Sequence, residues 1–515
     1  MPRPCNAVLC ALAISLAAGY FVTGHFLYRA PIGLDPSAYP LGEWIQRLAP
    51  NAHFAIAGPF WAIASLFAAA LLSLWLVRRS LAGRVDPERR RFLRGAGTTA
   101  GVALGSLAVG FAAGGARAFL GLGTGTKGWA RVGMPINDRD VPFTNPEWKE
   151  SWKGSRVQSY RRFGRTEWNV SDIVLGTGRI GGEDGEQIAR LAIERGVNYF
   201  DTSPDYSGAG SEMAMGRAIR AVPRDQLFIA SKWCTPIGHL PPGTPVAKYV
   251  EAVEGSLSRL GTDYLDLCHI HSCDEVERLM DPNVHEAFDR LKQAGNVRFL
   301  GFSSHTPNLV EVANTAIASN RFDVMMLAYH HGIWPQIPEI VKRARSERDM
   351  GVVAMKTLKG AKHRGLLDFQ RYAEAYSQAA LKWALSNEDV SCAVISFFQL
   401  QHVDEYLAAS GKRLSPHDLA ILGEYDRQIA GSYCGPHCGA CLDSCPEGLP
   451  IADVLRHRMY FEDYGWKKEG IVRYAALAKN ASVCAGCSAP CVGTCPVGID
   501  IQARMTGAHE LLTLS

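Results

Sequence analysis

The sequence predicts an α/β protein built around a closed (β/α)8 TIM barrel, with transmembrane helices before it and a small cysteine-rich domain after it. Three observations predict this architecture. Apolar strand-like segments alternate with helical patterns through the middle of the chain, three long uncharged stretches occupy its beginning, and eight of the fourteen cysteines fall between positions 434 and 495. At 515 residues, the chain is long enough for two or three domains.

These observations divide the chain into four parts. We assign residues 1–120 to membrane helices, 121–157 to a linker, 158–412 to the barrel and 413–515 to a helical, cysteine-rich domain. The net charge of +4 is small for this length, and no basic stripe with interleaved aromatic residues occurs. The composition therefore gives no reason to expect nucleic acid as a partner.

The first part contains three apolar stretches at 6–28, 52–77 and 95–116, each long enough to span a bilayer as a helix. The loop between the second and third stretches is rich in arginine, namely Arg78, Arg79, Arg84, Arg89, Arg90, Arg91 and Arg94. Positively charged loops stay in the cytoplasm. This rule places the N-terminus and the loop inside, and the chain after about residue 120 outside.

The arginine-rich loop includes the run Arg-Arg-Arg-Phe-Leu-Arg at 89–94, just before an Ala- and Gly-rich stretch. This run resembles a twin-arginine export signal, whose pathway moves proteins that have already folded around their cofactors. Alternatively, the arginines only orient a membrane hairpin. Cleavage of the signal and anchoring through all three helices both stay open. We expect the bacterial inner membrane, with the barrel and the cysteine-rich domain in the periplasm.

The middle of the chain predicts parallel βα units. Candidate strands lie at 172–176, 198–202, 227–232, 264–271, 298–303, 323–329, 351–356 and 392–396. Helical patterns between them include 185–195, 250–260, 282–294, 307–319, 338–345 and 371–387. Short apolar strands that alternate with helices indicate a parallel sheet, and eight of them suggest that the sheet closes into a barrel.

Four residues that suit carbonyl reduction stand at or just after the carboxyl ends of these strands: Asp201, Tyr206, Lys232 and His271. In such a barrel, these ends bear the catalytic residues. A lysine cation lowers the pKa of a phenol, so that the phenol can give a proton to a developing alkoxide. A carboxylate keeps the lysine charged and placed, and a histidine can donate a hydrogen bond to the carbonyl oxygen.

At these residues the chain resembles the aldo-keto reductase family, over roughly 158–410. The matching segments are YRRFGRT at 160–166, FDT at 200–202, SE at 211–212, SK at 231–232, DYLDL at 263–267 and GFS at 301–303. The resemblance implies that Tyr206 is the general acid, that Lys232 and Asp201 tune it, and that His271 orients the carbonyl. It also implies a small carbonyl or alcohol substrate.

The resemblance further implies a site for NADP(H) or NAD(H), with contacts from Ser303, Ser304, Met355, Lys356 and Glu405. The sequence departs from the family pattern at several of these positions. Met326 stands where a glutamine usually holds the carboxamide, and Phe397 and Phe398 replace basic residues near the adenosine phosphate. The sequence therefore leaves open whether the barrel binds NADP(H), NAD(H) or neither.

The cysteines near the C-terminus form two groups that each end in Cys-Pro. The groups are Cys434, Cys438, Cys441 and Cys445, then Cys484, Cys487, Cys491 and Cys495. Their spacings, C-x3-C-x2-C-x3-C-P and C-x2-C-x3-C-x3-C-P, each differ by one residue from the bacterial [4Fe–4S] ferredoxin run. Four disulfides in an exported domain and a zinc ribbon are the alternatives, and both fit this spacing less well.

Barrels of this family with a C-terminal ferredoxin-like extension form a recognisable subfamily. In two-cluster ferredoxins the fourth cysteine of one run ligates the cluster of the other. That resemblance implies two [4Fe–4S] clusters. One would use Cys434, Cys438, Cys441 and Cys495, and the other would use Cys484, Cys487, Cys491 and Cys445.

The sequence as a whole predicts a membrane-tethered iron–sulfur oxidoreductase, which reduces a carbonyl or oxidises an alcohol with electrons passed through its clusters. A conventional NADP-dependent aldo-keto reductase with structural clusters is the first alternative. The second is a non-catalytic electron-transfer subunit that keeps the barrel as a scaffold. The substrate and the redox partner are not specified by any motif.

Overall fold

The computed structural model describes residues 149–513 with gaps at 237, 360–375, 398, 436–437 and 463–466, together with Val109 on its own. Apart from Val109, the three apolar stretches, the arginine-rich loop and residues 121–148 of the predicted linker lie outside the described residues. Within the described ranges, no helix combines the length and the apolar character that crossing a bilayer requires.

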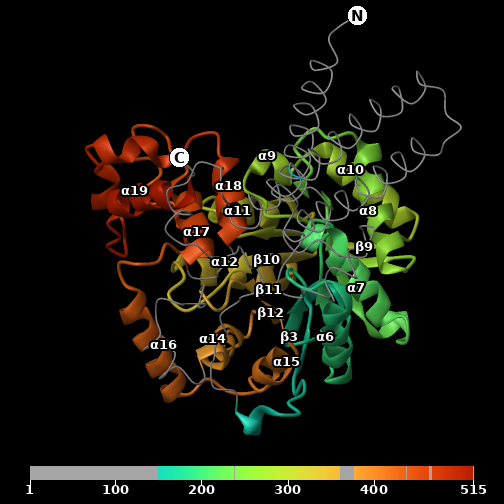
Figure 1. The fold of residues 1–515 in the computed structure, drawn as a ribbon. Helices are drawn as coiled ribbons and strands as arrows, with labels where there is room; N and C mark the ends of the chain where they lie inside the picture. Colours follow the sequence, from blue (N-terminus) through green and yellow to red (C-terminus); the bar gives the residue numbers. More distant parts are fainter. Residues whose placement is uncertain are drawn as a thin grey trace, which may run out of the picture.

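Eight parallel strands form a closed barrel, as the alternating pattern predicts (Figure 1). They are β3 (Ile173–Gly176), β4 (Tyr199–Asp201), β5 (Phe228–Lys232), β8 (Leu265–Ile270), β9 (Val297–Ser304), β10 (Val324–Ala328), β11 (Gly351–Met355) and β12 (Cys392–Ser396). Neighbours in sequence are neighbours in the barrel, and β12 pairs with β3 to close it. A two-stranded hairpin, β6 (Cys234–Thr235) and β7 (Gly238–His239), is inserted after β5.

Helices connect the strands. They are α6 (Gly182–Glu194), α7 (Gly210–Ile219), α8 (Val246–Leu260), α10 (Pro282–Gln293), α11 (Leu309–Ser319), α12 (Gln336–Arg348), α14 (Tyr376–Leu385) and α15 (Leu400–Leu407), with the short α9 (Val276–Leu279) before α10. Local sequence sets some of their ends. At α10, the Asp281 carboxylate accepts a hydrogen bond from the backbone N–H of Asn283, and Pro282 occupies the first helical position.

The amino end of the barrel is closed by an antiparallel hairpin, β1 (Tyr160–Arg162) and β2 (Asn169–Ser171). Phe163 follows β1 and is fully buried, with its ring 5.3 Å from the rings of Tyr199 and Phe228, the first residues of β4 and β5. Gly351 begins β11 beside the same ring, and a Cβ there would lie 2.6 Å from Phe163. This end of the barrel is therefore a packed apolar layer, which leaves the opposite end for chemistry.

The C-terminal part is helical and has an apolar core of its own. Its elements are α16 (Pro416–Ile429), α17 (Ile451–Glu462), α18 (Lys467–Ala475), the 3-10 helices η8 (Ala481–Gly486) and η9 (Pro490–Thr494), and α19 (Ile501–Leu512). Helix α16 packs on α14 through Tyr425, whose ring lies 4.2 Å from that of Tyr376. Helices α17 to α19 gather beside the barrel, on the left in Figure 1. Three cysteines, Cys441, Cys484 and Cys491, belong to their apolar core.

Candidate active site

The structure brings together Asp201, Tyr206, Lys232 and His271 at the carboxyl ends of three adjacent strands. Asp201 is the last residue of β4, Lys232 is the last of β5, and His271 directly follows β8. Tyr206 begins the 3-10 helix η6 (Tyr206–Ala209) in the loop after β4. Because β4 pairs with β5 and β5 with β8, parallel alignment alone brings these side chains to one place.

Lys232 and Asp201 form a buried ion pair at the base of this group. The Lys232 Nζ donates to Asp201 Oδ2 and to the backbone carbonyl of Thr202, both at 2.7 Å, and only 1% and 4% of the two side chains are exposed. Burial works against the charge of Lys232, but the Asp201 carboxylate and the Tyr206 phenol outweigh it and raise the Lys232 pKa. Lys232 therefore stays cationic at neutral pH.

Tyr206 lies between this cation and the histidine. The Lys232 Nζ is 4.6 Å from the centroid of the phenol ring, and the His271 ring lies edge-on to it at 5.7 Å. Burial raises the pKa of Tyr206 well above its ordinary value, and the Lys232 charge opposes that rise. The phenol consequently keeps its proton at neutral pH until a more basic oxygen forms beside it.

His271 is buried and electrically neutral. Burial lowers its pKa well below the usual range, and the nearby charge of Lys232 lowers it further. Two contacts use its Nδ1 atom: the Cys234 thiol at 3.2 Å and Asp205 Oδ2 at 3.5 Å. A neutral imidazole held through Nδ1 can present a protonated Nε2 to a substrate oxygen.

The residues predicted to hold a nicotinamide cofactor have mixed surroundings. The Ser303 hydroxyl accepts from the backbone N–H of Ser272 at 2.9 Å, and the Ser304 hydroxyl lies 3.4 Å from that of Thr306. Glu405 is buried on α15 and accepts a 2.5 Å hydrogen bond from Ser377. Three of the five residues predicted to contact the cofactor therefore already contact polar groups of the protein itself.

The other two predicted contacts adjoin the end of β11. Met355 is its last residue and is buried, and Lys356 follows with a left-handed backbone (φ 58°). Of the two aromatic residues predicted near the adenosine phosphate, Phe397 is fully buried, and Phe398 lies outside the described residues.

The C-terminal cysteines lie close enough to act on one another electrostatically. Charges of Cys438, Cys441 and Cys495 act on Cys434. Charges of Cys445, Cys487 and Cys491 act on Cys484. Cys491 also acts on Cys441, so the two sets overlap, and the partition of the cysteines between two clusters stays a prediction. All eight are free cysteines.

A cavity of about 270 Å³ lies between the C-terminal part and the barrel. Four cysteines face it, and from here on they are called the first cysteine group. The cavity is lined on one side by Cys434, Cys438, Cys441 and Cys495. On the other side lie barrel residues, including His330 after β10, Trp334 and Lys359. In the described part of the chain, no three of these thiols lie within 4.8 Å of one another, as ligands of a single ion would. A four-iron cubane is larger than one ion and needs thiolates set further apart.

Three residues of the site were not identified from the sequence: Asp205, Cys234 and His239. No motif in the sequence assigned a role to any of the three. The available signal was local: Asp205 directly precedes Tyr206, and Cys234 and His239 lie five residues apart in a short Pro- and Gly-containing turn. Their side chains meet only because the β6–β7 hairpin folds over the end of β8.

The fold and this site define the class of the protein: a (β/α)8 barrel enzyme with a tyrosine, a lysine, an aspartate and a histidine at the strand ends. Residues 172–373 match the model of the Aldo/keto reductase family. The chain therefore contains an aldo/keto reductase family domain and is an oxidoreductase.

The chain is also similar to individual proteins of known sequence or structure. The chain is 24% identical to L-galactose dehydrogenase from Arabidopsis thaliana, over 48% of this chain and 87% of that protein. It is 28% identical to the uncharacterized oxidoreductase YqkF from Bacillus subtilis, over 52% of this chain and 96% of that protein. The solved structure of aldo-keto reductase AKR11C1 from Bacillus halodurans matches with 23% identity and a TM-score of 0.43, over 52% of this chain and 95% of that one.

Proposed function

We propose that the barrel reduces a carbonyl or oxidises an alcohol, and that its electrons pass through two [4Fe–4S] clusters held by the C-terminal cysteines. The observation that carries this proposal is the cavity lined by Cys434, Cys438, Cys441 and Cys495 on one side and by barrel loops on the other. A cluster held only for the stability of the C-terminal part would have no reason to face the barrel. When bound, such clusters supply single electrons.

The residues of the barrel would transfer the proton and orient the substrate carbonyl. Carbonyl reduction takes up two electrons and two protons. Tyr206 retains its proton at neutral pH and would give it to the oxygen, while the proton that becomes bound to carbon would come from solvent; both protons would leave by the same routes when an alcohol is oxidised. Lys232, fixed by Asp201, would favour the phenolate left behind. His271 would hold the substrate oxygen by a hydrogen bond.

An electrostatic connection between the first cysteine group and the barrel supports the proposal. Burial raises the pKa of Cys434 to about 12, and the positive charge of Arg456 on α17 opposes this rise. Burial lowers the pKa of His305 well below its usual range, and Lys356 and Arg456 lower it further. His305 in turn lies 3.1 Å from the hydroxyl of Ser272, the residue after His271. Arg456 therefore lies within electrostatic reach of both the cysteines and the site.

The partition of the cysteines can be tested by iron content. Cys434→Ser and Cys495→Ser should impair the same cluster, whereas Cys445→Ser should impair the other, because Cys434 and Cys495 line one cavity that Cys445 does not line. Iron and EPR signals of the single variants and of the Cys434→Ser/Cys495→Ser double variant are the measurement. A double variant that loses clearly more iron than either single variant would contradict the partition, because the two changes would then act on different clusters.

The membrane tether and the periplasmic location belong to the proposal through the sequence alone. They depend on the apolar stretches at 6–28, 52–77 and 95–116 and on the arginine-rich loop. A reporter fused after Ser515, in a form active only outside the cytoplasm and in a form active only inside, tests the location. Activity of the inside reporter alone would overturn it.

An anaerobic titration with NADPH and then NADH tests the source of the electrons. The cluster absorbance and the EPR signal of reduced clusters are followed, with dithionite as the positive control. Bleaching by either nucleotide would show that a nicotinamide binds and passes electrons to the clusters. No bleaching, with dithionite still effective, would point to another donor, such as a quinone or an exported redox protein.

The same preparation separates the two alternatives. NADPH turnover that survives removal of the clusters would favour a conventional aldo-keto reductase with structural clusters. Cluster reduction by a partner without any carbonyl turnover, unchanged in Tyr206→Phe, would favour a non-catalytic electron-transfer subunit. Carbonyl turnover that needs both Tyr206 and the clusters is the result that we expect.

A further inference from the structure

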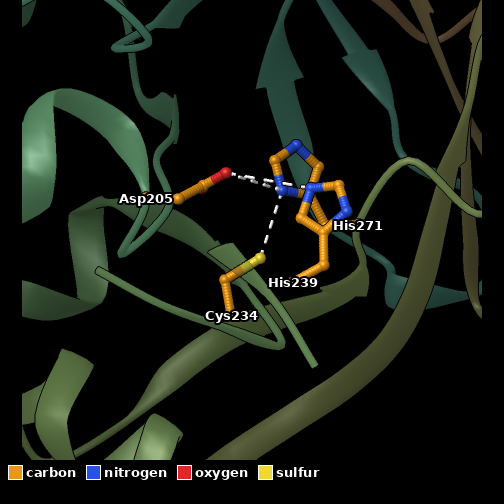
Figure 2. A group of neighbouring side chains, drawn as sticks. All are labelled: Asp205, Cys234, His239 and His271. Carbon is orange, nitrogen blue, oxygen red and sulfur yellow. Dashed lines mark hydrogen bonds and ion pairs between the residues drawn. The ribbon is translucent and has the colours of Figure 1, made fainter. Parts of the chain in front are cut away.

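A second cluster of ligand-type side chains lies beside the phenol of Tyr206, and no step proposed above uses it as a unit. One atom each from Asp205, Cys234, His239 and His271 lies within 4.8 Å of every other (Figure 2). Among the described residues, these four form the one such group. In Figure 2 the carboxylate, the thiol and both imidazole rings point toward a common centre.

Local structure explains why the four side chains meet. Cys234 and His239 are directly opposite each other in the antiparallel β6–β7 hairpin. Paired residues of this kind place their side chains on the same face of a hairpin. Asp205 comes from the loop after β4, and His271 from the end of β8. The β6–β7 hairpin therefore places Cys234 and His239 next to Asp205 and His271, which follow strands of the barrel.

Three of the six ligand-to-ligand distances come close to the edges of a tetrahedron, and the other three are within 4.8 Å. The Cys234 Sγ to His271 Nδ1 distance is 3.2 Å, Asp205 Oδ2 to His271 Nδ1 is 3.5 Å, and Asp205 Oδ2 to His239 Nε2 is 3.8 Å. Zinc bonds of about 2.0–2.3 Å to nitrogen, oxygen and sulfur imply ligand-to-ligand edges of roughly 3.3–3.6 Å. A thiol–imidazole hydrogen bond alone would explain the first distance, but not the convergence of a carboxylate and a second imidazole.

The surroundings orient the ligands. The Ser203 hydroxyl donates to Asp205 Oδ1, which leaves Oδ2 directed at the group. Cys234 is buried, whereas His239 is exposed and lies at the open side. The group thus has a hydrogen-bonded outer contact of the kind that metal ligands use, and a side from which an ion can enter.

We propose that Asp205, Cys234, His239 and His271 bind one zinc-class divalent cation. One thiolate, two imidazoles and one carboxylate are a ligand set that suits zinc, and binding releases the thiol proton of Cys234. Because four protein ligands fill a tetrahedral shell, the ion has a positioning role and leaves no coordination site for substrate.

The position of the ion suggests what it would do for the proposed function. It would tie the loop that bears Tyr206 to the ends of β5 and β8, since Asp205 precedes Tyr206. Bound to Nδ1 of His271, it would fix the tautomer in which Nε2 carries the proton and faces away from the ion. This role depends on the proposed carbonyl chemistry, whereas metal binding itself does not.

The test measures zinc and iron together in the full chain, purified anaerobically with its clusters loaded. Inductively coupled plasma mass spectrometry gives both metals per chain, and zinc K-edge X-ray absorption gives the ligands. We expect about one zinc per chain, with one sulfur and three nitrogen or oxygen neighbours. Zinc surrounded by four sulfurs would place it in the C-terminal cysteine groups and would overturn the proposal, as would protein that binds no zinc after incubation with it.

Matched variants decide which residues are responsible. His239→Ala alters an exposed side chain and should abolish stoichiometric zinc without changing iron. Cys234→Ser should do the same, whereas Cys268→Ser, an identical change at a buried cysteine of β8 outside the group, should retain zinc. Ser203→Ala, which removes the hydrogen bond to Asp205, should weaken zinc binding about 10-fold.

Two readouts keep this inference separate from the proposed function. Zinc that persists unchanged in both His239→Ala and Cys234→Ser would refute the site, whatever the activity. Loss of activity in Tyr206→Phe with zinc retained would leave the site intact and test only the chemistry. Zinc lost in His239→Ala, together with a fall in kcat larger than any change in KM, would show that the ion positions the catalytic residues.

Discussion

The barrel and the C-terminal part hold their functional side chains in different ways. The barrel is closed by hydrogen bonds between eight strands and by large apolar layers, so its polar residues stand on a frame that does not depend on them. In the C-terminal part, Cys441, Cys484 and Cys491 are themselves members of a small core between short helices. The prospective cluster ligands there also form part of the packing.

Because of this difference, substitution of a functional side chain should affect activity and folding differently in the two regions. At the strand ends of the barrel, a side chain such as the Tyr206 phenol can be changed with loss of chemistry and little loss of fold, whereas the buried Lys232–Asp201 ion pair contributes stability as well. In the C-terminal part, loss of a bound cluster should remove the fold as well, because metal binding and folding are coupled in small domains.

The largest expected effect is therefore unfolding of the C-terminal part when the clusters are removed by anaerobic chelation. Hydrogen exchange should show lost protection over 438–513, while β3–β12 of the barrel keep theirs. Equal protection of α17 and α19 with and without the clusters would mean that the apolar core of this part is sufficient on its own.

Next in size is the loss of activity in Tyr206→Phe, about 10²- to 10⁴-fold in kcat, because the proton donor is removed. The control is Tyr199→Phe, in the buried aromatic layer at the amino end of the barrel, where the hydroxyl has no hydrogen-bond partner among the described residues. Steady-state turnover of a carbonyl substrate is the measurement. Comparable losses in both variants would indicate general damage to the barrel.

The third effect is on stability. Lys232→Met leaves the Asp201 carboxylate buried without its partner and should cost about 3–5 kcal/mol in the free energy of unfolding. Lys248→Met breaks a 2.6 Å ion pair with Glu251 that is largely exposed, and it should leave the denaturation midpoint almost unchanged. Urea unfolding of the two variants compares them directly, and equal shifts would contradict the distinction.

The smallest effect is on the pH dependence of carbonyl reduction. Burial raises the pKa of Tyr206 above its ordinary 10.0, so the donor is protonated below that pH, and the rate should fall only above it. Burial lowers the pKa of His271 well below 6.5, so this residue adds no change near 6.5. A pH–rate profile that is level from 6.5 to 10 is expected, and a half-maximal point near either ordinary pKa would argue against this assignment.

The prediction of the barrel succeeded because its signals are local. Each strand is a short apolar run, and parallel pairing of consecutive strands fixes the order without further information. For the same reason Asp201, Lys232 and His271 could be assigned to one end of the barrel from position alone. The helix α7, by contrast, was not named in the sequence analysis, because a run of Gly, Ala and Met shows weak periodicity.

The prospective zinc ligands could not be predicted in the same way. Cys234 and His239 lie in a six-residue hairpin whose register, not its composition, directs both side chains to the same face. The cavity between the cysteines and the barrel was equally beyond prediction, because its two walls come from segments about one hundred residues apart in the chain.

The sequence by itself determined the closed barrel, the oxidoreductase class and the presence of two cysteine groups. These follow from periodicity and from residue types at fixed spacing, which act over a few residues. Only the tertiary structure decided that Asp205, Cys234 and His239 surround His271, and that the first cysteine group faces the barrel. These contacts join segments that are far apart in the sequence. Packing and strand register determine them, so they cannot be predicted from the spacing of residues along the chain.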